Sequence, residues 1–439
     1  VWNLLCEAPD GPFTSTSQDA MQLTLQSGCL QMFVSRLIPT PSLFAVIALL
    51  STINVAAAGS GPRMIEVSDT NQTYTGMIVA KSAGECFIVD RFGRQAQLPI
   101  AGLKSFSVVA ENFRSASQSE FRRMLETELG TEYEFTTSKH YIVGGTRGHS
   151  RSYAALFEEI FNQVDSFYSL RGFRTSSPDT PLVALVLKDQ EAFKKYCEGD
   201  QMAWTNGLRG YYSLRSNRVV MYDQAELFRS VQLSPEADPQ PHSTVVTAAA
   251  SMSDAAQFSE TNSVLRLQKA AAASTVNGDT ADTIIHETTH QVSFNIGIHS
   301  RTGGTPSWVL EGMATTLEAP GMRTRSSSEK STKVNQERLE WFKSAYSQHR
   351  QPGDLAKLIA SDDMFRQQTL DAYSAAWGIT WFLTENPARA QLFSKYLKSL
   401  RGRDPLQEYT AQQRLKDFQT VFGDISRLEV DYVRAIESL

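Results

Sequence analysis

Cysteine pairs of the kind that bind zinc are missing from this sequence. The chain of 439 residues has four cysteines, and none of them lies in a C-x-x-C pair, which argues against cysteine-ligated zinc. Cys86 and Cys197 are far apart in the sequence. We expect them to be two buried or free thiols rather than a disulfide.

An excess of charge of one sign is also missing. The chain has 42 Lys and Arg residues against 47 Asp and Glu residues, which gives a formal net charge of −5. Because there is no basic excess and no long charged run, we expect neither a nucleic-acid partner nor a solvating tail. The hydrophobic content of 41% is ordinary for a globular protein, and the length suits two or three domains. The sequence does not indicate an oligomeric state.

The apolar run near the start of the chain is too short to span a membrane comfortably. It covers residues 43–55, follows one positive charge and precedes the small residues 56–58. This is the layout of a secretory signal peptide with an A-x-A cleavage site. We therefore expect a signal peptide at 32–58, translation starting near Met32, and a preceding segment, 1–31, that is disordered or a mis-annotated start.

A signal peptide predicts export to the periplasm, the cell envelope or the extracellular space. The mature protein would then begin near Gly59. The alternative is an uncleaved segment that anchors the protein, and this is the one way in which we expect a membrane to be involved.

Residues 62–110 alternate short β-rich runs with glycine turns, a pattern that predicts strands. Their spacing predicts a small barrel of the SH3-like kind with a docking or structural role. Residues 111–130 are rich in Arg, Ser and Glu and predict a polar helical connector. The expected strands are 76–80, 85–90, 94–99 and 103–109.

From residue 131 onward the pattern alternates between helix and strand. Apolar residues follow Ser150 at helical spacing, and residues 181–187 form a continuous apolar run of strand length. Residues 210–223 hold two β-rich runs separated by a turn signal at Ser216 and Asn217, which predicts a hairpin.

The second half of the chain is expected to be mainly helical. Residues 233–278, rich in Ala, Ser, Thr and Pro, predict a flexible insertion, and residues 401–439 predict C-terminal helices. The whole sequence therefore favours an α+β fold.

The stretch TIIHETTHQVSFNIG, residues 283–297, places two histidines four residues apart around a glutamate. In a helix, residues four apart lie on one face, so His286 and His290 can offer two imidazole nitrogens to one zinc ion. Glu287 is rotated by about a third of a turn and can reach a water on that ion without binding the ion.

A catalytic zinc site needs a third protein ligand. One known arrangement needs a histidine at the position of Ile296, and His299 fits no suitable spacing. The helix expected in TPSWVLEGMATTLEAP, residues 305–320, is apolar nearly all round except for Glu311. A buried carboxylate must be neutralised, paired or bound to a metal. The neighbouring Gly312 costs about 1 kcal/mol relative to Ala in a helix, which indicates close packing.

The sequence also predicts where these two helices begin and end. Asp279 or Thr280 can cap the first helix, and Gly297 can end it. Thr305 can cap the second helix, with Pro306 at its first position.

The motif HETTH, followed about twenty residues later by WVLEGMA, resembles the gluzincin zinc metallopeptidases of clan MA. Within them the chain is most similar to uncharacterised bacterial proteins of domain-of-unknown-function family 1570, with HExxHQ and WxxEGxA motifs. The resemblance implies a zincin-like fold over residues 131–400, with a β-bearing upper lobe and a helical C-terminal lobe. It also implies a zinc ion held by His286, His290 and Glu311, with Glu287 as general base.

The resemblance further implies that the 210–223 hairpin lies along the cleft and can pair with an extended peptide. One position departs from the family pattern, because Thr315 stands where an acidic residue often orients a zinc-bound histidine. Such enzymes also use a Tyr or His to stabilise the oxyanion, and Tyr373 is the candidate, with Tyr211 or Tyr212 behind it. The remaining histidines are expected to be ordinary surface or core residues: His140, His149, His242 and His349.

The sequence therefore predicts an exported zinc metallopeptidase that acts on peptides or proteins. Two alternatives stay open. One is a catalytically degenerate metallopeptidase fold that serves as a binding module at the cell envelope. The other is a helical scaffold with incidental histidines, which leaves the burial of Glu311 unexplained.

Overall fold

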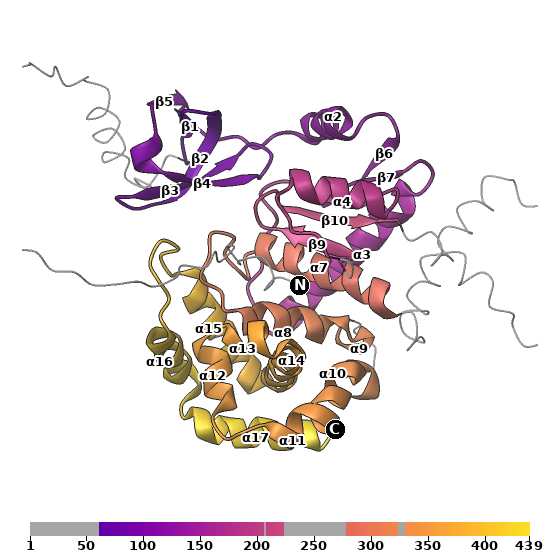
Figure 1. Ribbon diagram of the computed structural model, residues 1–439, viewed down its shortest axis with the longest axis vertical. Helices are drawn as coiled ribbons and strands as arrows, with labels where there is room; N and C mark the ends of the chain where they lie inside the picture. The colour runs from indigo at the N-terminus through magenta and orange to yellow at the C-terminus, as the bar shows by residue number, and fades with distance from the viewer. Residues whose placement is uncertain (1–60, 206–207, 224–277, 324–329) are drawn as a thin grey trace, which may run out of the picture.

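The computed structural model describes four stretches of the chain: residues 61–205, 208–223, 278–323 and 330–439 (Figure 1). The predictions for residues 1–58 and for nearly all of 233–278 lie outside these stretches. In the described part of the chain, no helix combines the length and the apolar character that a membrane crossing requires. The architecture is mixed α+β with two sheets.

Sheet A is antiparallel and has the strand order β4-β3-β2-β1-β5. Each of the four predicted strands forms, and the sequence pattern missed β1. Among the described residues, β4 and β5 lie at opposite edges and do not pair, so the predicted barrel is wrong. The strands are β1 Met64–Ser68, β2 Thr73–Lys81, β3 Glu85–Asp90, β4 Gln95–Pro99 and β5 Ser105–Ala110.

The free edge of β4 has another partner. The Gln95 backbone N–H donates to the Arg215 carbonyl oxygen at 2.7 Å. The adjacent Arg301 donates from Nη2 to the Gly93 and Leu214 carbonyl oxygens at 2.8 and 2.7 Å. Sheet A is therefore tied to the rest of the molecule by the same edge that would have closed a barrel.

Sheet B has the order β6-β7-β8-β10-β9, with parallel pairing among β7, β8 and β10 and antiparallel strands at both edges. All six residues of β8 are buried, as a continuous apolar run predicts for a strand that is covered on both faces. The strands are β6 Tyr133–Thr137, β7 Tyr141–Thr146, β8 Leu182–Leu187, β9 Gly210–Ser213 and β10 Arg218–Tyr222.

Helices cover both faces of sheet B. Alternate residues of β8 show this, because Leu182 and Ala184 join the core formed with α3 and α7, whereas Val183 and Leu185 join the core formed with α2 and α4. The predicted amphipathic helix after Ser150 is therefore α3, and it covers the same face of sheet B as α7. The helices are α2 Gln118–Leu129, α3 Ser150–Leu170, α4 Gln190–Gly199 and α7 Gly278–Asn295.

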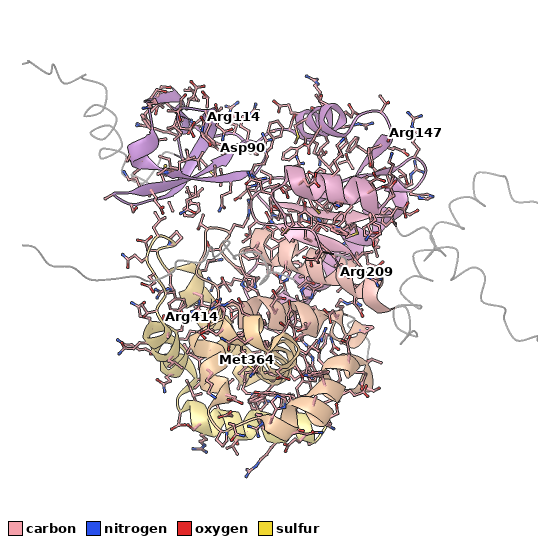
Figure 2. All side chains as sticks on the ribbon, viewed as in Figure 1. Asp90, Arg114, Arg147, Arg209, Met364 and Arg414 are labelled. Carbon is pink, nitrogen blue, oxygen red and sulfur yellow. The ribbon has the colours of Figure 1, made fainter. Side chains whose placement is uncertain are left out.

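The C-terminal part is helical, and α7 lies between it and sheet B (Figure 1). Helix α8, Ser307–Glu318, packs against α7 and against α14, Thr369–Glu385. Figure 2 shows Met364 among the helices of this lower part. Besides the short η2 Ile100–Gly102 between β4 and β5, the remaining helical segments are α9 Pro320–Arg323, η3 Lys330–Lys333, α10 Gln336–Trp341, η4 Phe342–Tyr346, α11 Ser347–His349, α12 Asp354–Ala360, α13 Asp363–Gln367, α15 Pro387–Arg401, α16 Ala411–Phe422 and α17 Ile425–Glu437.

Candidate metal centre

Helix α7 carries the two histidines of the HETTH motif. It begins at Gly278, so Asp279 and Thr280 lie inside the helix and the predicted cap is wrong. It ends at Asn295, and Gly297 then adopts a φ of 81°, as predicted for the residue that stops a helix. The helix that carries Glu311, α8, begins one residue later than predicted, because Pro306 occupies the cap position.

Gln291, which follows the second histidine, anchors α7 to sheet B. It is fully buried, and its Nε2 donates to the carbonyl oxygens of Val183 and Asn217 at 2.9 and 2.8 Å. Since these carbonyls belong to β8 and to the turn that leads into β10, one side chain fixes the helix to two neighbouring strands. Sequence reasoning assigned no role to this residue.

The structure brings the three predicted ligands together. The Nε2 atoms of His286 and His290 lie 3.1 Å apart. The Glu311 Oε2 atom lies 3.1 Å from His286 Nε2 and 3.8 Å from His290 Nε2. Two tetrahedral zinc ligands, each about 2.0–2.1 Å from the ion, are separated by about 3.4 Å. The donor set therefore fits a divalent ion, and His286, His290 and Glu311 are the residues that could hold one.

Glu311 is buried, as predicted, with 5% of its surface exposed. Burial alone would raise the pKa of its carboxyl, but His290 and His286 outweigh that effect and hold the pKa well below its usual value. Burial lowers the pKa of His286, whereas hydrogen bonds to Glu311 and Glu318 raise it to about 10. The two carboxylates Glu311 and Glu318 therefore favour the positively charged form of His286.

Glu318 is the partner that sequence reasoning left unassigned. Its Oε1 lies 2.8 Å from His286 Nδ1, and its Oε2 accepts a 2.6 Å hydrogen bond from Asn335 Nδ2. Thr315 does not take this role, because its hydroxyl donates to the Glu311 carbonyl of its own helix. The available signal was the spacing of seven residues, which places Glu318 two turns beyond Glu311 on the same face of α8.

Glu287 and Tyr373 lie beside the triad. Glu287 is buried, and its Oε2 accepts a 2.8 Å hydrogen bond from the Tyr212 backbone N–H. The Tyr373 hydroxyl hydrogen-bonds Glu311, and its ring centroid is 6.4 Å from that of His286. Burial, together with the charges of Glu311 and Glu287, raises the pKa of Tyr373 well above its usual value. Tyr373 therefore keeps its proton and remains a hydrogen-bond donor at neutral pH.

The two reserve tyrosines are engaged elsewhere. The Tyr211 hydroxyl donates to Asp200 and the Tyr212 hydroxyl donates to Asn217, so neither is placed as an oxyanion donor. All four residues of β9 are buried and the Tyr212 N–H is already donated. The hairpin edge is therefore not open to a peptide at Tyr212.

The remaining predicted residues take ordinary structural positions. Burial lowers the pKa of His299 to about 3, and this histidine is not part of the triad. His242 lies outside the described residues. Cys86 and Cys197 are free and buried, as predicted. The other histidines each contact a carboxylate: His140 with Glu158, His149 with Asp223 and His349 with Asp371.

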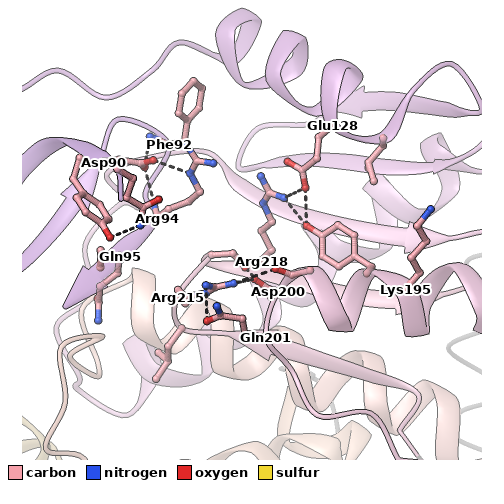
Figure 3. Close-up of a pocket in the computed structure, with 18 of the residues that line it drawn as sticks. Asp90, Phe92, Arg94, Gln95, Glu128, Lys195, Asp200, Gln201, Arg215 and Arg218 are labelled. Carbon is pink, nitrogen blue, oxygen red and sulfur yellow. Dashed lines mark hydrogen bonds and ion pairs between the residues drawn. The ribbon is translucent and has the colours of Figure 1, made fainter. Parts of the chain in front are cut away.

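A cleft of about 1690 Å³ lies between sheet A and α4, away from the triad (Figure 3). None of the three candidate ligands lines it. Because its labelled arginines face acidic partners, the cleft does not indicate one class of ligand. The pairs are Arg94 with Asp90, Arg215 with Asp200 and Arg218 with Glu128.

Comparison with known proteins adds one finding. No curated protein matches the chain. A match is found between residues 280–407 and the profile of a family described as "Protein of unknown function (DUF1570)". Over this stretch, which contains all three candidate ligands, the chain is similar to the DUF1570 family.

Proposed function

We propose that the protein is an exported zinc-dependent metallopeptidase that hydrolyses peptide bonds in peptides or proteins. The proposal rests on the ligand atoms of His286, His290 and Glu311, which all lie within 4.8 Å of one another. Glu287 lies on α7, the helix that carries both histidines. The proposed export rests on the sequence of residues 32–58 alone.

The protein groups have distinct parts in the proposed reaction. A zinc ion bound in such a site would lower the pKa of a water molecule and polarise the carbonyl group of the scissile bond. Glu287, oriented by the Tyr212 N–H, takes a proton from the attacking water and passes it to the leaving amine. Tyr373 differs from Tyr211 and Tyr212 in that its hydroxyl partner is the candidate ligand Glu311 itself; on substrate binding it would turn this donor to the oxygen on which negative charge develops.

The Glu287→Gln variant tests the catalytic part of the proposal. The amide keeps the size of the side chain but cannot act as a general base, so peptide hydrolysis should fall by about 10²–10⁴-fold, with zinc content unchanged. A peptide-library cleavage assay and metal analysis measure the two properties. Glu437→Gln, at an exposed position in α17 far along the chain from the site residues, is the matched control.

Two outcomes would contradict catalysis by this site. Hydrolysis that is equal in wild type and Glu287→Gln would exclude Glu287 as the base. A zinc-loaded wild type that cleaves no peptide in the library would favour the degenerate binding module instead.

A further inference from the structure

Arg338 is a largely buried cation close to the triad. Its side chain is 17% exposed, and its guanidinium carbon lies 5.6 Å from the centre of the Tyr373 ring. The same ring lies 6.4 Å from the His286 ring, measured between ring centroids. The guanidinium carbon is therefore within about 12 Å of the centre of the His286 ring.

The backbone of Arg338 is held in place from two sides. Its N–H donates to Asn335 Oδ1 at 3.2 Å, and its carbonyl oxygen accepts a hydrogen bond from Ser374 at 2.6 Å. Asn335 also donates to Glu318, which contacts His286. The position of Arg338 is therefore coupled to the same residues that orient the triad.

The described residues compensate the charge of Arg338 only weakly. Among them, its ion pair is with its chain neighbour Glu337, at 3.3 Å, and the Glu337 side chain is 71% exposed. Its Nε atom is buried and has no hydrogen-bond partner among the described residues. The Nε atom of Arg414 also lacks a partner, but its two terminal nitrogens both donate to the carboxylate of Asp362 at 3.0 and 3.1 Å, a pairing that Arg338 does not have among the described residues. A guanidinium is a fork of donors suited to a carboxylate, and leaving one partly buried without such a partner is costly.

We propose that Arg338 binds a carboxylate of the substrate, and that the site prefers peptides with a carboxylate close to the scissile bond. Each extended residue spans about 3.3–3.6 Å, so a guanidinium within about 12 Å of the His286 ring limits this group to the first few residues beyond the bond. The C-terminal carboxylate and an acidic side chain share this chemistry. The inference rests on the proposed function, since it assigns a specificity to the same site.

Peptide binding to a hydrolysis-disabled protein tests the inference. The full-length, zinc-loaded Glu287→Gln protein is titrated with three fluorescent peptides: dansyl-Ala-Ala-Ala as the free acid, dansyl-Ala-Ala-Ala-amide and dansyl-Ala-Ala-Glu-amide. At least one carboxylate-bearing peptide should bind tenfold or more tightly than the neutral amide. The peptide that gains affinity identifies the source of the carboxylate.

Substitution of Arg338 in the same background completes the test. Arg338→Gln should abolish the preference, because the loss of a charge-assisted pair costs about tenfold or more in affinity, while binding of the neutral amide stays within twofold. Arg338→Lys should restore part of the preference. Lys343→Gln removes an exposed charge from the neighbouring turn and should change nothing, and zinc content and thermal midpoint verify that each variant is folded.

The outcomes separate this inference from the proposed function. Equal binding of all three peptides, no binding of any of them, or an equal loss for acid and amide in Arg338→Gln would overturn the role of Arg338. A wild-type protein that hydrolyses acids and amides alike would do the same while leaving the peptidase proposal intact. A carboxylate preference in a protein without hydrolytic activity would support Arg338 and reject the peptidase.

Discussion

Glu318 is the residue on which the orientation of His286 depends. Its carboxylate contacts the ring nitrogen that faces away from the other ligands, and Asn335 fixes the second carboxylate oxygen. This contact holds the His286 Nε2 atom toward the metal position, as outer-shell carboxylates do in zinc proteins.

We expect Glu318→Gln to weaken zinc binding by about 10–100-fold without abolishing it. Competition with a chromogenic chelator measures this affinity. The control is Glu337→Gln, which should bind zinc like the wild type because that side chain is 71% exposed. Unchanged affinity in Glu318→Gln would show that the triad does not need this partner.

The residues of the candidate site were only partly predictable from the sequence. The two histidines and Glu311 were accessible, because helical spacing places the first pair on one face and a lone carboxylate in an apolar helix demands a partner. Glu318 left only one signal, its spacing of seven residues from Glu311, and Arg338 left none. Their roles arise only when residues 335–338 fold back onto α8 and α14, a tertiary contact that local patterns do not encode.

At the scale of elements, α8 packs closely against α14 at Gly312, and this contact buries the neighbouring Glu311. A Cβ atom on Gly312 would lie 2.3 Å from Thr380 Oγ1 and 2.5 Å from the Ala376 carbonyl oxygen. The backbone of α14 cannot move away easily, so the glycine predicted to mark a close approach is required there.

Gly312→Ala should therefore lower the free energy of unfolding by about 1–3 kcal/mol through overpacking. Gly378→Ala is the matched control on α14, since its Cβ would meet Ile436 and Tyr432 at 3.4 and 3.5 Å, ordinary contact distances. It should stabilise the protein by up to about 1 kcal/mol through helix propensity. Chemical denaturation measures both, and a Gly312→Ala variant as stable as the control would contradict the packing argument.

Most individual helices and strands could be predicted from local sequence patterns. The expected closure of sheet A into a barrel and the exact ends of the helices could not. The apolar run of β8 and the apolar stripe of α3 were predicted because buried positions are filled by apolar residues, which recur with the period of the strand or helix. The barrel failed because the edge of β4 pairs with the turn around Arg215, a contact between segments more than a hundred residues apart. The start of α7 was predicted wrongly because Asp and Thr, which often cap helices, can also stand inside one. Asp279 and Thr280 both lie inside α7.

At the scale of the whole molecule, Arg301 connects the loop between α7 and α8 with sheet A and with the β9–β10 turn. Its guanidinium donates to two carbonyl oxygens, one in each of those regions. Charge-assisted hydrogen bonds contribute about 1.5–3 kcal/mol each, which makes this residue a central contact between sheet A and the rest of the chain.

Arg301→Ala should lower the thermal midpoint and speed proteolysis in the segment 111–117, between β5 and α2, with zinc content unchanged. Limited proteolysis followed by mass spectrometry locates the cleavage. Arg122→Ala removes an exposed ion pair with Glu126 inside α2 and should have little effect. Equal proteolysis of the two variants would mean that Arg301 does not hold sheet A in place.

Metal analysis of purified wild type, Glu311→Ala and Glu311→Gln tests most directly whether one divalent ion joins α7 to α8. Wild type should hold about one zinc ion per chain, and both variants should lose it on dialysis while circular dichroism shows their helices intact. Full zinc occupancy in the folded variants, or a wild type that binds no zinc, would contradict a metal centre built from His286, His290 and Glu311.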